Sequence, residues 1–134
     1  MPRAVVADDH WAVLEQLARV LAGEIELVAS VGDGPSAVEA TDRLNPDLVI
    51  LDISMPLGNG IAAARDLQRH GSRSKVIFLS VQEHADYVKA AFSAGACGYV
   101  LKACMHSDLL PAIREVLAGR TFISSAIQGT VSLQ

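Results

Sequence analysis

Short apolar runs alternate along the chain with segments in which apolar residues recur every three or four positions. The runs are typical of buried strands, and the recurring spacing is typical of helices with one apolar face. Regular alternation of the two predicts an α/β protein built from βαβ units around a parallel sheet. We expect strands at residues 4–7, 27–31, 48–51, 76–79 and 98–101, and helices at 11–21, 36–44, 60–70, 85–94 and 108–117.

Four of the expected strands end in polar residues of different kinds. Asp8-Asp9 follow the first strand and Asp52 follows the third, while the fourth and fifth strands run into Ser80 and Lys102. In an open α/β sheet, the carboxyl ends of the strands face one crevice in which ligands bind. We therefore expect three carboxylates, a hydroxyl and an ammonium group to share one site.

Three carboxylates at such close range need a cation. Two of these charges at about 4 Å repel by about 4 kcal/mol at an effective dielectric near ~20. Oxygen ligands of this kind suit Mg²⁺. The alternative is that Asp8, Asp9 and Asp52 only cap helices. Capping explains a single aspartate well, but it explains matched acids at two strand ends poorly.

The chemistry expected of this residue set is phosphoryl transfer. An aspartate can act as the nucleophile, and the transfer depends mainly on positioning and charge neutralisation. Asp52 would attack, Lys102 would offer a point charge to the phosphate oxygens, and Ser80 would donate a hydrogen bond. Taken alone, Lys102 is typical of an exposed strand end and Ser80 of a turn. The prediction of a phosphoryl-transfer site therefore depends on the position of both residues at strand ends that also carry the aspartates' site.

Composition narrows the class of protein further. The 134 residues suit one domain, and the net charge of −4 comes without a basic run that would favour nucleic-acid binding. No apolar stretch approaches the roughly 20 residues of a membrane span. Cys97 and Cys104 form neither a disulfide framework nor a metal-binding spacing. We expect a cytoplasmic protein.

The motifs at the strand ends resemble those of the receiver domains of two-component response regulators. The resemblance covers about residues 3–118 and implies a flavodoxin-like (βα)5 fold. In that fold a doubly wound, five-stranded parallel sheet has the strand order 2-1-3-4-5. The segments that carry the resemblance are Val6-Ala7-Asp8-Asp9-His10, Leu51-Asp52-Ile53-Ser54-Met55-Pro56 with Gly60, Leu79-Ser80, and Gly95-Ala96-Cys97-Gly98-Tyr99-Val100-Leu101-Lys102.

This resemblance implies a role for each site residue. Asp52 would be the phospho-acceptor, with a sensor histidine kinase as the donor and partner. Mg²⁺ would be held by Asp8, Asp9 and Asp52 together with the backbone carbonyl of Ser54. The chain would then be a signalling protein and not an enzyme.

The resemblance also implies a switch. Ser80 and Lys102 would contact the phosphoryl group, and Tyr99 would turn inward as Ser80 moves toward it. The surface of the fourth helix, fifth strand and fifth helix would change, favouring a homodimer or releasing an output domain. From spacing alone, Tyr99 is better explained as an ordinary half-buried strand aromatic.

The Asp-Asp-His start and the segment from Ala118 to Ser124 are similar to the NarL/FixJ (LuxR) type of regulator. That type regulates transcription through a C-terminal helix-turn-helix, so DNA would be contacted only through an output domain that this chain lacks. We expect residues 1–118 to be the receiver domain. Residues 119–134 are expected to form a linker without a sixth strand. A stand-alone receiver is the alternative.

Three other functions remain open. An aspartyl-phosphate hydrolase of the haloacid dehalogenase type would need a second aspartate where Ser54 stands. A receiver that is never phosphorylated would act only as an interaction module. A flavodoxin-like cofactor binder would need a glycine-rich phosphate loop after the first strand, where Asp8-Asp9 stand instead.

Two further features allow more than one interpretation. Trp11, the only tryptophan, either lies on the rim of the site or packs into the core. The histidines His10, His84 and His106 could form a transition-metal cluster, although the sequence places them in three separate loops.

Overall fold

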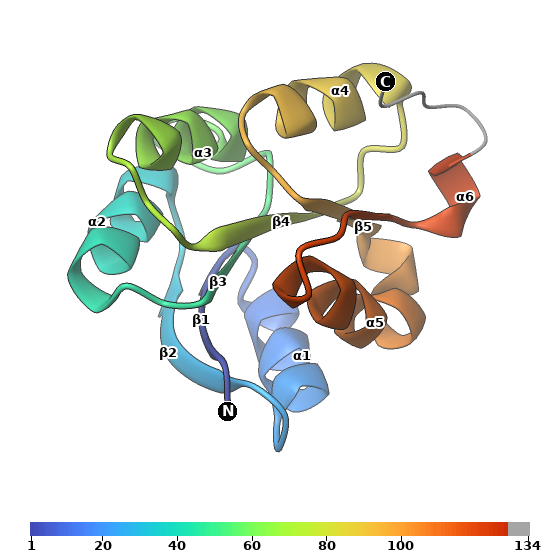
Figure 1. Cartoon of the computed structure of the whole chain (residues 1–134), viewed down its shortest axis with the longest axis horizontal. Helices are drawn as coiled ribbons and strands as arrows, with labels where there is room; N and C mark the ends of the chain where they lie inside the picture. The colour runs from blue at the N-terminus through green and yellow to red at the C-terminus, as the bar shows by residue number, and fades with distance from the viewer. Residues whose placement is uncertain (129–134) are drawn as a thin grey trace.

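A parallel sheet runs through the centre of the protein, seen in a computed structural model that describes residues 1–128 (Figure 1). Within these residues the sheet has six strands in the order β2-β1-β3-β4-β5-β6. The strands are β1 (Arg3–Ala7), β2 (Glu26–Val31), β3 (Leu48–Leu51), β4 (Lys75–Ser80), β5 (Gly98–Leu101) and β6 (Phe122–Ile123). The predicted α/β class and the order of the first five strands are confirmed.

Helices cover both faces of the sheet, as the doubly wound prediction requires. On one face lie α2 (Gly34–Leu44), α3 (Gly60–Arg69) and α4 (Ala85–Ser93), and on the other lie α1 (Trp11–Leu21) and α5 (Met105–Leu117) (Figure 1). A 3₁₀ turn (Lys102–Cys104) precedes α5, and a short α6 (Ser125–Gln128) follows β6. No helix among residues 1–128 is long and apolar enough to cross a bilayer.

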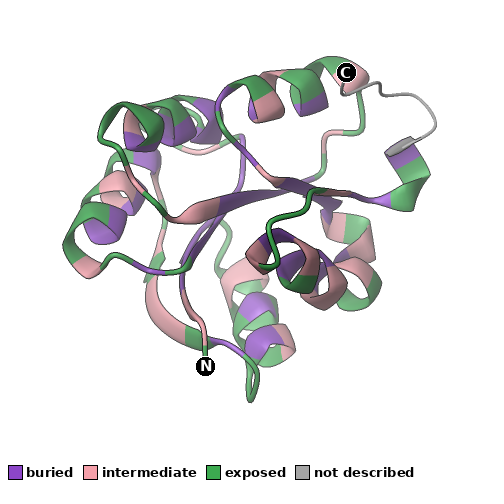
Figure 2. Cartoon of the chain, in the orientation of Figure 1, coloured by how far each residue is buried: buried purple, intermediate pink, exposed green. Residues whose placement is uncertain are grey.

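The core consists of two apolar clusters separated by the sheet. One cluster joins α2, α3 and α4 to the sheet, and the other joins α1 and α5 to its opposite face. Every residue of β3 and of β5 is buried, which gives the purple centre of Figure 2. Burial on both faces explains why these strands read as continuous apolar runs in the sequence.

The prediction that no sixth strand follows residue 118 is wrong. Phe122 and Ile123 pair in parallel with Gly98 and Tyr99 of β5. The edge of β5 would otherwise leave backbone groups unpaired, and this segment satisfies them. Two residues are too few to show the alternation by which a strand is recognised in a sequence.

Two helices begin earlier than the sequence predicts. α2 is expected from residue 36, but the Asp33 side chain accepts a hydrogen bond from the Ser36 N–H at 2.7 Å, and the helix starts at Gly34. α5 is expected from residue 108 but starts at Met105. The start of α5 matters to the site, because Lys102 lies in the turn directly before this helix.

Candidate functional site: an acidic cluster bridged by Lys102

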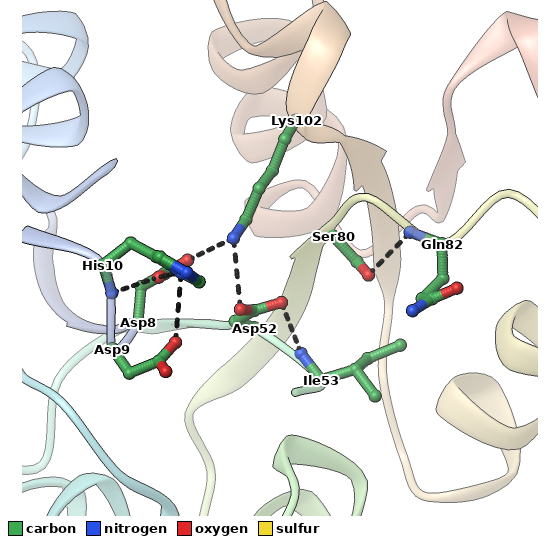
Figure 3. A network of polar contacts seen from close by, with 8 residues as sticks. All are labelled: Asp8, Asp9, His10, Asp52, Ile53, Ser80, Gln82 and Lys102. Atoms are coloured by element: carbon green, nitrogen blue, oxygen red, sulfur yellow. Dashed lines mark hydrogen bonds and ion pairs between the residues drawn. The ribbon is translucent and has the colours of Figure 1, made fainter. Parts of the chain in front are cut away.

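Strand register brings the predicted site residues together. Ala7 of β1 lies opposite Leu51 of β3, so Asp8 and Asp52 leave neighbouring strands at the same level. The Asp52 N–H donates to the Ala7 carbonyl oxygen at 3.0 Å, which fixes the start of the loop. Figure 3 shows Lys102, which directly follows β5, pointing to Asp8 and Asp52, while Ser80 at the end of β4 lies beside them with its hydroxyl toward Gln82. The expected convergence of the strand ends is therefore present.

Lys102 connects the two buried carboxylates. Its Nζ lies 2.6 Å from Asp8 Oδ2 and 3.1 Å from Asp52 Oδ2, while Asp8 and Asp52 are only 1% and 4% exposed. The second oxygen of Asp52, Oδ1, accepts a hydrogen bond from the Ile53 N–H at 2.8 Å. Both oxygens of Asp52 are thus held in place, one by a backbone amide and one by a mobile cation.

The surroundings of these groups shift their pKa values. Burial raises the pKa of Asp52, the hydrogen bond from Lys102 opposes that rise, and the charge of Asp8 adds to it. For Lys102, burial acts to lower the pKa, but the close contacts with the carboxylates of Asp8 and Asp52 outweigh it, so the pKa is raised. The lysine therefore carries its charge at neutral pH, in direct contact with the carboxylates.

The acidic cluster has the composition and size of a cation site. One ligand atom from each of Asp8, Asp9, His10 and Asp52 lies within 4.8 Å of the others. Opposite ligands of Mg²⁺ are about 4.2 Å apart, since each lies near 2.1 Å from the ion. Small side-chain movements therefore suffice to hold the ion.

One buried oxygen supports this fit. Asp8 Oδ2 makes no hydrogen bond of good geometry within the described residues, although it lies 2.6 Å from Lys102 Nζ. The contact is thus an ion pair, and the lone pairs of Asp8 Oδ2 accept no hydrogen bond from these residues. Such an oxygen, buried beside other carboxylates, is suited to a second cation.

Ser80 and Tyr99 are linked through the backbone of Gln82. Ser80 Oγ accepts a hydrogen bond from the Gln82 N–H at 3.0 Å, and the Tyr99 hydroxyl donates to the Gln82 carbonyl oxygen at 2.8 Å. Tyr99 is fully buried and its ring lies near that of Phe78. Burial raises the pKa of the Tyr99 hydroxyl. Tyr99 is therefore fully and not half buried, and its role as a switch residue stays a prediction.

The structure also decides the two open sequence features. Trp11 is 74% exposed at the start of α1, which excludes core packing and agrees with a place on the rim. Among residues 1–128, possible metal ligands gather in one group, which includes His10 but neither His84 nor His106. The three-histidine cluster is therefore wrong. Cys97 and Cys104 are free thiols.

Three contacts at the site were not predicted from the sequence. His10 Nδ1 lies 3.1 Å from both Asp8 Oδ1 and Asp9 Oδ1. The one sequence feature that indicates this contact is the position of His10 next to two aspartates. Gln82 bonds through its backbone N–H and carbonyl oxygen, which every residue type except proline has, so the sequence does not indicate these contacts. Gly60 packs so closely that a Cβ there would lie 1.8 Å from the Asp52 carbonyl oxygen.

Comparison with known proteins identifies the family. The family model of the response regulator receiver domain matches residues 4–114. Together with the doubly wound fold and the acidic cluster, this match shows that the chain belongs to the response regulator receiver domains. The resemblance seen in the sequence is confirmed.

Individual relatives agree with this assignment. The chain is 39% identical over 121 residues to the transcriptional regulatory protein DegU of Brevibacillus brevis, covering 89% of this chain and 51% of DegU. It is 30% identical over 125 residues to the nitrate/nitrite response regulator protein NarL of Escherichia coli, covering 92% of this chain and 58% of NarL. The chain thus spans just over half the length of these relatives.

A solved structure gives the same result. A two-component response regulator of the LuxR family from Aurantimonas sp. SI85-9A1 superimposes with a TM-score of 0.91 at 29% identity, covering 96% of this chain and 94% of that one. The superposition includes nearly all of the described residues. The similarity to LuxR-type regulators is therefore present in structure as well as in sequence.

Adding Mg²⁺ is expected to stabilise the protein and change the fluorescence of Trp11. An ion that binds only the folded chain stabilises it by about 2.7 kcal/mol at a hundred times its dissociation constant, and Trp11 stands two residues from Asp9. The midpoint of thermal unfolding and the tryptophan emission would be followed as Mg²⁺ is added. We expect Asp9→Asn to weaken both responses and Glu26→Gln, on the exposed start of β2, to leave them unchanged. Equal loss in both variants would contradict a site at the strand ends.

Proposed function

We propose that the chain is the phospho-acceptor receiver of a two-component response regulator, with Asp52 as the residue that takes the phosphoryl group. The donor would be a phosphohistidine of a sensor histidine kinase. The observation that carries this proposal is the position of Lys102, whose ammonium group joins the buried carboxylates of Asp8 and Asp52. A cation held there is suited to the oxygens of an incoming phosphoryl group.

The residues around Asp52 support in-line attack on phosphorus. The Ile53 N–H fixes one carboxylate oxygen at 2.8 Å, so the side chain does not have to search for its orientation. Lys102 neutralises negative charge on the phosphoryl oxygens, and the Ser80 hydroxyl donates a hydrogen bond to one of them. As the bond between Asp52 and phosphorus forms, the bond from phosphorus to the donor imidazole breaks.

Mg²⁺ would be held by Asp8, Asp9, Asp52 and the backbone carbonyl of Ser54. When bound, it supplies positive charge that neutralises the phosphoryl oxygens. Two observations support these assignments. Asp8 Oδ2 accepts no hydrogen bond from residues 1–128, and Ser54 is exposed in the loop after β3. Ser80 and Tyr99 would be the switch residues, joined through Gln82.

The wider role proposed is transcription regulation through an output domain. DegU is named a transcriptional regulatory protein and NarL a nitrate/nitrite response regulator protein, and the chain matches only part of each. Residues 1–118 would be the receiver and 119–134 would lead toward a DNA-binding domain. Phosphorylation would favour a homodimer. We propose a cytoplasmic signalling protein, since a cytoplasmic regulator reaches both a kinase and DNA.

Intact mass after incubation with Mg²⁺ and acetyl phosphate tests the acceptor role. We expect one adduct of about 80 Da on the unaltered chain, lost when EDTA removes the metal. Asp52→Asn should give no adduct, because an amide oxygen is a poor nucleophile toward phosphorus. An adduct of the same yield on a folded Asp52→Asn protein would move the acceptor to another residue.

A second measurement separates the receiver from the hydrolase alternative. A phosphatase turns over small phosphate esters continuously, whereas a receiver forms an acyl phosphate in a single step and holds it. We expect no steady-state release of phosphate from such esters beyond that of the Asp52→Asn control. Continuous turnover that depends on Asp52 would favour the hydrolase.

A further inference from the structure

The segment after α5 is docked on the strand that carries Tyr99 and leads into Lys102. β6 pairs with β5 so that Ile123 lies beside Tyr99. Ile123 and Ile127 are buried in the same apolar cluster as Tyr99. Ser124, between them in the chain, has no exposed surface. Residues 122–128 are called the docked tail below.

Ser124 is bonded to β5 at two points. Its N–H donates to the Tyr99 carbonyl oxygen at 3.0 Å, and its hydroxyl oxygen accepts from the Leu101 N–H at 3.1 Å. The bond to Leu101 lies next to the site, because Leu101 directly precedes Lys102. These two hydrogen bonds fix the position of the docked tail on β5. If the tail and β5 moved apart, both bonds would break and leave buried polar groups without partners.

Two series of contacts lead from the strand ends of the site to Ser124, and one of them begins at Asp52 itself. One runs from Ser80 through the backbone of Gln82 to the Tyr99 hydroxyl, and from the Tyr99 carbonyl oxygen to Ser124. The other runs from Asp52 to Lys102, then along the backbone to Leu101 and across to Ser124. Both series of contacts end on Ser124. They reach it through Tyr99 and through Leu101, which lie two residues apart in the fully buried strand β5.

We infer that docking of the tail on β5 is coupled to phosphorylation of Asp52, with Ser124 as the residue that links the two. This inference rests on the function proposed above. A phosphoryl group bonded by Ser80 and Lys102 would restrain both the loop at Gln82 and the end of β5.

Fixing these two places keeps Tyr99 buried in the cluster that covers Ile123 and Ile127. Phosphorylation therefore strengthens docking of the tail. Because coupling between two binding equilibria is reciprocal, docking of the tail must strengthen the binding of a phosphoryl mimic at Asp52 to the same degree. Any output domain that follows the tail would be positioned by this contact.

Hydrogen–deuterium exchange of the whole chain tests the inference directly. The comparison is between the chain with Mg²⁺ alone and with Mg²⁺ and beryllofluoride, a phosphoryl mimic. We expect slower exchange in residues 98–101 and 122–127, and no change in β2 at the far edge of the sheet. Unchanged or faster exchange in the tail would overturn the inference.

A variant pair tests the reciprocal effect. Ser124→Ala removes the acceptor of the Leu101 N–H, and we expect it to weaken beryllofluoride binding, read from Trp11 fluorescence, by about fivefold or more. Ser125→Ala removes an exposed hydroxyl one residue away and should leave binding unchanged. Equal binding by the two variants would overturn the role of Ser124. If Ser124→Ala does not fold, the exchange experiment on the unaltered chain decides.

Failure of the inference is distinguishable from failure of the proposed function. An adduct on Asp52 together with unchanged exchange in the tail would overturn the coupling alone. No adduct on a folded chain would overturn the phospho-acceptor role and the coupling with it.

Discussion

Gly60→Ala is expected to destabilise the protein by more than about 3 kcal/mol, the upper range for overpacking a core. The added Cβ would lie 1.8 Å from the Asp52 carbonyl oxygen, 2.9 Å from its carbonyl carbon and 3.1 Å from Phe78 Cε1. Two of these atoms belong to the backbone, so no side-chain rotation relieves the clash. The loop that carries Asp52 has to move.

Displacement of Asp52 should also impair phosphoryl transfer. A misplacement of about 1 Å at a reacting group can cost on the order of a hundredfold in rate. We expect this loss in the rate of adduct formation with acetyl phosphate, measured under conditions in which the variant remains folded. Urea unfolding supplies the stability difference from the same preparation.

The matched control for this experiment is Gly32→Ala. At Gly32 the nearest atom to an added Cβ would be the Asp8 carbonyl oxygen at 3.9 Å, an ordinary contact, and the backbone there has no positive φ. We expect a stability change within about 1 kcal/mol. A loss as large as that of Gly60→Ala would mean that glycine flexibility in these loops, and not the clash with Asp52, sets the cost.

Four of the five main strands, β1, β3, β4 and β5, could be predicted because each is a buried apolar run with a polar end. β2 is only partly buried and could be predicted from its apolar residues between two helices. Residues 48–51 and 98–101 agree with β3 and β5 to the residue. β6 could not be predicted in this way. Its two residues are held by pairing to β5 and by burial of Ile123 in the apolar cluster that also contains Tyr99, and neither cause is visible in a local pattern.

The site likewise has residues that a local sequence pattern could predict and contacts that it could not. Asp8, Asp52 and Lys102 could be brought together from the sequence, because parallel strands end at one edge of the sheet. The contacts of Gln82 and Ser124 could not, since they depend on backbone atoms and on the docked tail. His10 lies between these cases: it stands beside two acids in the sequence, but only the structure brings its ring against both carboxylates.

Lys102→Met is expected to slow phosphorylation of Asp52 by about a hundredfold or more, the usual cost of removing one charge-stabilising donor from a transition state. Methionine keeps most of the apolar stem, while the ammonium between Asp8 and Asp52 is lost. Mg²⁺ binding should persist, because the carboxylates remain. Lys89→Met, on the exposed face of α4, is the matched control and should phosphorylate normally.

The same variant should lose stability in a pH-dependent manner. Breaking a buried ion pair costs about 3 kcal/mol or more when the carboxylates are charged. The raised pKa of Asp52 means that the folded chain binds more protons there than the unfolded chain, so stability falls as pH rises from the usual value of 3.8 through the raised pKa. Loss of Lys102 raises that pKa further and steepens the fall.

Urea unfolding near pH ~4 and pH ~7 tests this dependence. We expect the stability difference between the unaltered chain and Lys102→Met to be smaller at the lower pH, where Asp52 with its raised pKa is protonated to a greater extent, than at neutral pH. Lys102 itself stabilises the fold below its usual pKa of 10.5, and that contribution is lost only as pH rises through its raised pKa. A difference between the two proteins that stays constant from acid to neutral pH would mean that Lys102 acts through packing of its stem, and not through its charge beside Asp52.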